Sequence, residues 1–168
     1  MNFESVVELA HSEGRDLLNE VEAKQLLAQA GVPVVETVLA TSVEEAKLAA
    51  EKIGYPVVVK VVSADISHKS DVGGVKIGLV DAEEVSQAYQ AIMANSRAAV
   101  PDAVITGVAV QAMASEGIEV IIGMVKDPQF GPVMMFGLGG IFVELLKDVS
   151  FRVLPLTERD ARQMVDDI

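Results

Sequence analysis

Apolar and polar positions along the chain recur with two periods, one typical of helices and one typical of strands. Asn19 with Glu22, and Ser42 with Glu45, have the capping-box spacing that marks the start of a helix. The pattern predicts helices over residues 4–13, 20–30, 42–54 and 82–99 and a last helix from Thr157, and strands over residues 34–40, 56–62, 75–80, 104–113, 118–125 and 132–138. Strands joined by helices and followed by a hairpin predict an α+β fold rather than a doubly wound sheet.

The composition is that of a globular chain, and the charge limits its partners. Apolar residues make up 51% of the sequence and aromatic residues 4%, so aliphatic side chains and methionine are expected to form the core. The formal net charge of −12 argues against a nucleic-acid or anionic-membrane partner, because phosphate backbones bind to basic faces. A small phosphorylated ligand is compatible with this charge, because it needs only a few well-placed lysines.

The absence of cysteine and the acidic first residues argue against a secreted protein, and the short length of the most apolar run argues against a membrane span. The sequence has no cysteine, which excludes disulfides, thiolate metal sites and cysteine nucleophiles. Its first residues, MNFESVVELA, carry acids where a signal peptide carries bases. The most apolar run, GPVMMFGLGGIFVELL, is shorter than the roughly 20 residues of a membrane helix and contains glycines and an acid. We expect a soluble, cytoplasmic protein.

Lys60 stands inside the valine run PVVVKVV, which is otherwise apolar on both faces of the predicted strand. An ammonium group in such a place must reach water or be paired, because an unpaired buried charge is costly. One interpretation is that Lys60 reaches an edge of the sheet or pairs with a carboxylate. The other is that its partner is a phosphate.

The polar loop SADISHKSDVGGV follows this strand and favours the phosphate interpretation. Backbone N–H groups at Gly73 and Gly74 can approach an anion because no side chain intervenes. Lys69 and Lys76 add positive charge on either side. The alternative is a turn that needs flexible glycines for its shape alone.

The segment YPVVVKVVSADISHKSDVGGV resembles the nucleotide-binding segment of the ATP-grasp domain in ADP-forming (NDP-forming) acyl-CoA synthetases, relatives of the succinyl-CoA synthetase β subunit. The resemblance continues in order through VAVQAM and GIEVIIGMVKDPQFGPVMMFGLGGIFVELLKDVSFRVLPLT, and covers nearly all of the chain from about residue 18. It implies an ATP-grasp fold whose first lobe has an antiparallel sheet plus helices. The implied divisions are a helical extension over residues 1–17, a first subdomain over 18–110, a hinge over 111–117 and an incomplete second subdomain over 118–168.

The resemblance also implies roles for single residues. Lys60 would bind the nucleotide phosphates, and the loop from His68 through Gly74 would close over them. The hinge that begins at Gln111 would offer backbone groups to the adenine edge, and the Glu119 carboxylate would accept hydrogen bonds from the ribose diol. Solvation at a strand edge is the alternative for Gln111 and Glu119. The expected nucleotide-binding residues are Lys60, Lys69, Ser70, Gly73, Gly74, Gln111, Ala112, Met113 and Glu119.

His68 is the expected catalytic residue. A neutral imidazole is a good nucleophile near neutral pH, and its phosphoramidate is reactive enough to pass the phosphoryl group onward. The resemblance implies that His68 relays a phosphoryl group between subunits. The alternative is an ordinary exposed loop histidine. His11, on a polar N-terminal helix, receives no functional interpretation.

A glycine-rich stretch, GLGG at residues 137–140, is too common a pattern to predict a phosphate loop. The resemblance implies that it lies near the active site, with Glu144, Asp148 and Arg152 along the nucleotide cleft. A hairpin corner with a salt-bridged rim would explain the same residues.

Family members continue past the last predicted helix to an acidic segment that binds magnesium, and this sequence has no such segment. The resemblance therefore implies ATP or ADP with Mg²⁺ whose ligands lie outside this chain, and no metal site within it. It also implies a CoA-binding and ligase α subunit or domain as partner, in an oligomeric parent protein. The last helix ends in Val-Asp-Asp-Ile without a glycine stop, so we expect the sequence to end before its domain is complete.

The expected function is the ATP-grasp part of an ADP-forming acyl-CoA synthetase with a phosphohistidine relay. One alternative is a non-catalytic, ATP-grasp-like regulatory module of a protein acyltransferase. The segment FVELLKDVSFRVLPLT argues against that alternative, because it resembles the synthetases. A third interpretation is an inactive nucleotide-binding fragment.

Overall fold

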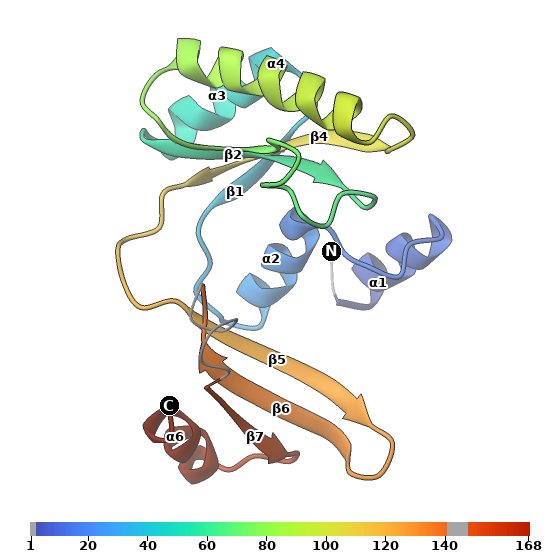
Figure 1. Ribbon diagram of the computed structural model, residues 1–168, viewed down its shortest axis with the longest axis vertical. Coiled ribbons are helices and arrows are strands. Elements are labelled where there is room, and N and C mark those ends of the chain that lie inside the picture. Colours follow the sequence, from blue (N-terminus) through green and yellow to red (C-terminus); the bar gives the residue numbers. More distant parts are fainter. Residues whose placement is uncertain (1–2, 141–147) are drawn as a thin grey trace. The chain divides into compact units, whose positions relative to one another are not determined.

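A computed structural model describes residues 3–140 and 148–168, and the chain divides into two compact units, Met1–Ala114 and Ser115–Ile168. Each unit has an antiparallel sheet with helices (Figure 1). The expected α+β class is therefore confirmed. The subdomain limits given by the resemblance stay a prediction.

The first unit contains a four-stranded sheet in the order β1-β4-β2-β3. Helices α3 and α4 cover one face of this sheet, and α2 lies on the other side (Figure 1). The sheet is antiparallel throughout, which matches the expected first lobe. The elements are α1 (Phe3–Ser12), α2 (Glu20–Gln29), β1 (Thr37–Ala40), α3 (Val43–Ile53), β2 (Val57–Ser63), β3 (Val75–Leu79), α4 (Ala82–Ala99) and β4 (Ile105–Ala112).

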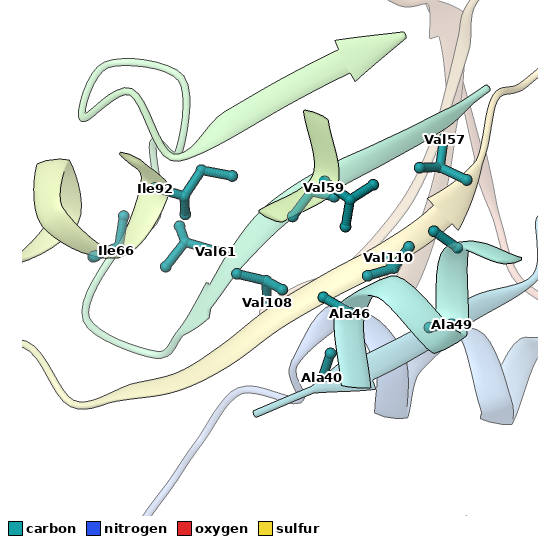
Figure 2. Packing of buried hydrophobic residues seen from close by; sticks show 12 residues of the cluster. Ala40, Ala46, Ala49, Val57, Val59, Val61, Ile66, Ile92, Val108 and Val110 are labelled. Carbon is teal, nitrogen blue, oxygen red and sulfur yellow. The ribbon is translucent and has the colours of Figure 1, made fainter. Parts of the chain in front are cut away.

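The strand period of two decides which side chains of β2 enter the main core. Val57, Val59 and Val61 are each 0% exposed and face the two helices, as Figure 2 shows. They pack against residues of β4, α3 and α4, among them Val108, Ala46 and Ile92. The intervening residues of β2 therefore point to the other face of the sheet, toward α2.

Helix starts follow the sequence signals. Asn19 caps α2 by accepting from the N–H groups of Val21 and Glu22, and the Glu22 carboxylate accepts from the Asn19 N–H at 2.8 Å. Ser42 caps α3 by accepting from the Glu45 N–H. The Glu45 carboxylate reaches one residue further back than expected, to the Thr41 N–H at 2.7 Å. Thr157 caps α6 in a complete capping box, as the sequence predicted.

The second unit contains a three-stranded sheet, β5-β6-β7, and the helix α6. The predicted hairpin is confirmed, since β5 (Val120–Asp127) and β6 (Gly131–Leu138) pair antiparallel. The sequence analysis missed β7 (Val149–Val153), which pairs with β6. Helix α6 (Glu158–Asp166) buries Met164. None of the helices in the described part of the chain has the length and apolar character that a membrane span requires.

Candidate functional site

Lys60 lies near the middle of β2, on the sheet face that α2 covers. Its neighbours Val59 and Val61 point the other way into the main core, so the alternation of the strand sets the direction of Lys60. The Lys60 side chain is 23% exposed, which leaves its ammonium group in need of a partner.

That partner is a carboxylate on α2. The Lys60 Nζ lies 2.9 Å from the Glu20 Oε1, and Lys24 Nζ lies 3.0 Å from the same oxygen. The second oxygen of Glu20, Oε2, lies 3.1 Å from the Nζ of Lys69. One carboxylate therefore joins three ammonium groups, from a helix, a strand and the loop after that strand. We call Glu20, Lys24, Lys60 and Lys69 the lysine cluster.

Gln111 completes the cluster from β4. Its side-chain oxygen accepts from Lys24 at 2.7 Å and from Lys60 at 3.1 Å, and the residue is 7% exposed. Lys24 also donates to the hydroxyl of Thr37 on β1 at 2.9 Å. A buried amide oxygen shared by two ammonium groups is satisfied in this way, so strand-edge solvation does not describe Gln111.

The lysines of the cluster lower the pKa of Glu20. Burial raises the pKa of this carboxyl, but the hydrogen bonds from Lys60, Lys24 and Lys69 outweigh burial and lower its pKa from the ordinary 4.5 to about 2. Three cations against one anion leave an excess of positive charge. A chain with a formal net charge of −12 thus keeps a cationic centre in its first unit.

Acidification is expected to destabilise the first unit through Glu20. Because folding depresses the pKa of Glu20, its stabilising contribution is complete above about pH 4.5 and is lost as the pH falls toward about 2. A depression of this size corresponds to about 3 kcal/mol of unfolding free energy. This contribution of Glu20 is measured by urea unfolding of the native chain and of Glu20→Gln, each at about pH 7 and about pH 3. At about pH 7 we expect the native chain to have a larger free energy of unfolding than Glu20→Gln, and at about pH 3 we expect this difference between the two proteins to be smaller. A difference between them that is the same at both pH values would contradict this role of Glu20.

The loop between β2 and β3 is held by backbone hydrogen bonds. The N–H of Gly74 donates to the Lys69 carbonyl at 2.8 Å, and the N–H of Gly73 donates to the Ser70 carbonyl at 3.0 Å. Gly73 has a φ of +64°, and a side chain on Gly74 would meet Val61 at 2.7 Å. Both glycines are therefore required by the shape of the turn. In this conformation their N–H groups serve the turn, so binding of a phosphate by them would need these bonds to exchange.

His68 and Ser70 flank Lys69 and are both exposed. Ile66, at the start of the loop, is anchored in the core at 4% exposure. A cavity of about 650 Å³ runs beside this part of the loop, and Ser67, Lys69 and Glu20 are among the residues that line it. His68 therefore stands on an exposed part of the loop, between two residues that line this cavity.

Two further predicted residues, Ala112 and Met113, stand at the end of β4. Ala112 is its last residue, and its N–H donates to the Glu36 carbonyl at 3.3 Å. Met113 follows the strand and is 40% exposed. Their role toward an adenine ring stays a prediction.

Glu119 belongs to the second unit, where it lies against the GLGG stretch. The N–H of Gly139 donates to the Glu119 carbonyl at 2.8 Å. A side chain on Gly140, whose φ is +59°, would meet the Glu119 carboxylate at 2.7 Å. Close packing against Glu119 thus explains two of these glycines without a phosphate.

Of the three residues expected along the cleft, Glu144 lies outside the described residues. Asp148 directly precedes β7. Arg152 on β7 pairs with Asp167 at 2.7 Å, which agrees with the alternative of a salt-bridged rim.

Sequence reasoning missed Glu20 and Lys24. The pair has the i,i+4 spacing of a helical ion pair, and this signal was readable in the sequence. The link from Glu20 to Lys60 spans 40 residues and depends on how α2 packs on the sheet. The structure gives Lys60 the carboxylate partner of the first interpretation, and the phosphate of the second interpretation stays a prediction.

The sequence profile of the ATP-grasp domain matches residues 9–168. The chain belongs to the ATP-grasp family. The β subunit of the ADP-forming acetate–CoA ligase I of Pyrococcus furiosus is 53% identical over 163 residues, which make up 97% of this chain and 70% of that subunit. Within the ATP-grasp family, the chain therefore belongs with the β subunits of ADP-forming acetate–CoA ligases, and the resemblance read from the sequence is confirmed.

Solved structures of this ATP-grasp family agree with the fold. The dinucleotide-forming acetyl-coenzyme A synthetase 1 of Ca. Korarchaeum cryptofilum, in complex with coenzyme A and Ca-AMPCP, has a TM-score of 0.94 and 51% identity; the match covers 97% of this chain and 71% of that one. The same enzyme with coenzyme A and Mg-AMPPCP has its phosphohistidine segment pointing towards the nucleotide binding site. That match has a TM-score of 0.83 and 46% identity, and covers 98% of this chain and 70% of that one.

Proposed function

We propose that this chain is the nucleotide-binding part of an ADP-forming acyl-CoA ligase, with acetate as the acid. The ligase interconverts acetyl-CoA, ADP and phosphate with acetate, ATP and CoA. The observation that carries the proposal is the lysine cluster, in which three ammonium groups meet beside the loop that bears His68. An excess of positive charge beside an exposed imidazole suits the transfer of a phosphoryl group.

The proposed relay has three balanced steps. Phosphate attacks the thioester carbonyl of acetyl-CoA, and CoA leaves as the thiol, which gives acetyl phosphate. A nitrogen of His68 then attacks the phosphorus of acetyl phosphate, the P–O bond to the acyl group breaks, and acetate leaves. Finally the terminal phosphate oxygen of ADP attacks the phosphorus on His68, the P–N bond breaks, and ATP forms with a neutral imidazole.

In the last step, the transfer from His68 to ADP, several residues of the first unit are proposed to have separate roles. Lys60 binds the phosphates of the nucleotide, and Lys69 brings the loop and its histidine to them. An ammonium group that pairs with a carboxylate can also bind a phosphate, since both are oxyanions. Gln111, Ala112 and Met113 are proposed to receive the adenine, and Glu119, a residue of the second unit, is proposed to receive the ribose.

Magnesium belongs to this proposal as a companion of the nucleotide. Among residues 3–140 and 148–168, no three histidine, aspartate or glutamate side chains gather as a metal site would require. The described residues therefore do not fit the ion by themselves, and no step of the relay is assigned to it here. Its ligands are proposed to lie outside this chain.

A second subunit or domain that binds CoA is proposed as the partner that forms acetyl phosphate. Support comes from the relative in Pyrococcus furiosus, which is a β subunit. A regulatory module of a protein acyltransferase is not favoured, because the relative matched over 97% of this chain is a ligase subunit. A cytoplasmic location agrees with such an enzyme.

Phosphate labelling tests the proposed function. The native chain, assembled with its α partner, is incubated with ATP labelled in the terminal phosphate, and the labelled peptide is identified by mass spectrometry. The sequence contains two histidines, His11 and His68, so a phosphohistidine has only two sites on this chain. We expect acid-labile label on His68 and none on His11. A native complex that takes no label on His68 would refute the proposal.

A further inference from the structure

The Glu20 carboxylate is neither the nucleophile nor a phosphate ligand in the relay proposed above. Its two oxygens have different partners: Oε1 lies 3.0 Å or less from the ammonium groups of Lys24 and Lys60, and Oε2 lies 3.1 Å from that of Lys69. One oxygen thus faces a helix and a strand, whereas the other faces the loop. The carboxylate is a bridge between the fixed part of the cluster and the part that carries His68.

Backbone hydrogen bonds hold the loop internally, with the carbonyls of His68 and Lys69 accepting from the N–H groups of Asp71 and Gly74, and the bridge ties this stretch to α2. The ends of the loop are fixed by the buried Ile66 and by Gly74, whose carbonyl accepts from the Val61 N–H at 2.8 Å. Val72 packs against the core. Between these anchors, the pair of Lys69 with Glu20 is the one ion pair that ties the loop to another element within the described part of the chain. A cavity of about 650 Å³ lies beside this stretch in place of a packed core.

Glu20 itself is held rigidly. It is the first residue of α2, and the capping box of Asn19 and Glu22 fixes that end of the helix. Arg15 adds a bond to the Glu22 carboxylate at 2.9 Å, which ties the segment before α2 to the helix. A carboxylate at the start of a helix is also favoured by the helix dipole. The anchor for Lys69 is therefore better fixed than the loop that it holds.

We propose that Glu20 is a positioning residue that docks the His68 loop through Lys69 and keeps the three ammonium groups together until a phosphate arrives. Without the carboxylate, three like charges would repel one another. When a nucleotide phosphate takes Lys60, Oε1 loses one of its two partners, while Oε2 still holds Lys69. Glu20 thus keeps His68 at the cluster during phosphoryl transfer. The inference rests on the proposed function, because it assigns His68 the transfer step.

The proposal predicts opposite effects of Glu20→Gln on two steps. The amide has the size of the carboxylate but no charge, so it stops competing with phosphate for the lysines, and we expect ADP to bind as tightly as before or more tightly. The loop loses its ion pair, so we expect His68 to be labelled from ATP about tenfold more slowly, and amide hydrogen exchange near His68 to be about tenfold faster without nucleotide. Glu20→Asp, which keeps the charge, should restore part of the labelling rate.

Glu22→Gln is the matched control, because glutamine at this position keeps the capping box with Asn19, and Glu22 pairs with Arg15 instead of a lysine. The test uses the complete chain assembled with its α partner, with calorimetry for ADP and mass spectrometry for exchange and label. Native exchange or a native labelling rate in Glu20→Gln would overturn the inference, and so would an equal loss of ADP binding and labelling in both variants, which indicates a damaged helix. If even the native complex takes no label, the proposed function fails, and the exchange comparison alone decides whether Glu20 docks the loop.

Discussion

Replacing His68 with alanine is expected to lower turnover of the assembled ligase by about 1,000-fold or more, because the reaction loses its nucleophile. ADP binding should stay unchanged, since the lysine cluster makes no use of the imidazole. His68 is exposed, so the substitution leaves the core untouched. ATP formation from acetyl-CoA, ADP and phosphate measures turnover, and calorimetric titration measures ADP affinity.

His11→Ala is the matched control, because it removes the other histidine of the chain from an exposed position near the end of α1. We expect its turnover and its phosphate label to equal those of the native complex. Retention of turnover in His68→Ala, or loss of ADP binding together with turnover, would contradict the assignment of His68 as the relay. Loss of label in His11→Ala would mean that His11 is the residue that carries the phosphoryl group.

Local signals in the sequence predicted most of the fold. The apolar run PVVVKVV predicted β2, with Lys60 as the one polar residue of that run, and the Asn19 and Thr157 caps predicted the starts of α2 and α6. The missed strand β7 has the sequence VSFRV, which alternates apolar and polar residues and so carried the signal of a half-buried strand. It is only five residues long and contains an arginine, and its pairing with β6 depends on tertiary structure.

The candidate site was predictable only in part, because its decisive contacts are long-range. The apolar residues around Lys60 in the sequence predicted that its ammonium group needs a partner. They were compatible with either a carboxylate or a phosphate as that partner. Which carboxylate fills that role depends on the packing of α2 on the sheet, and nothing in the strand itself specifies Glu20. The glycines behave differently: Gly73 and Gly74 were expected to serve a phosphate, yet their local geometry already requires glycine.

Replacing Lys60 with alanine is expected to weaken ADP binding by about 10- to 100-fold, the effect of losing one charged hydrogen bond to a phosphate. The fold should survive, because Glu20 keeps Lys24 and Lys69 as partners and is not left as an unpaired buried charge. The same reasoning predicts that His68 still becomes phosphorylated when acetyl phosphate is supplied, since that step needs no nucleotide. Calorimetry with ADP measures the first effect, and label from acetyl phosphate the second.

Lys52→Ala separates the local contact from the change in net charge. Lys52 is on α3, its side chain is 76% exposed, and it pairs with Glu36 at 3.6 Å and not with a member of the lysine cluster. This variant loses the same unit of charge, so it should bind ADP as the native chain does if the contact at Lys60 matters. Equal weakening in both variants would mean that the overall charge of the chain attracts the nucleotide, and native affinity in Lys60→Ala would mean that Lys60 serves only to pair with Glu20. Lys60 uses two of the three N–H donors of its ammonium group, on Glu20 and on Gln111, so the third donor is left for a phosphate, and the variants measure how much that contact contributes to ADP binding.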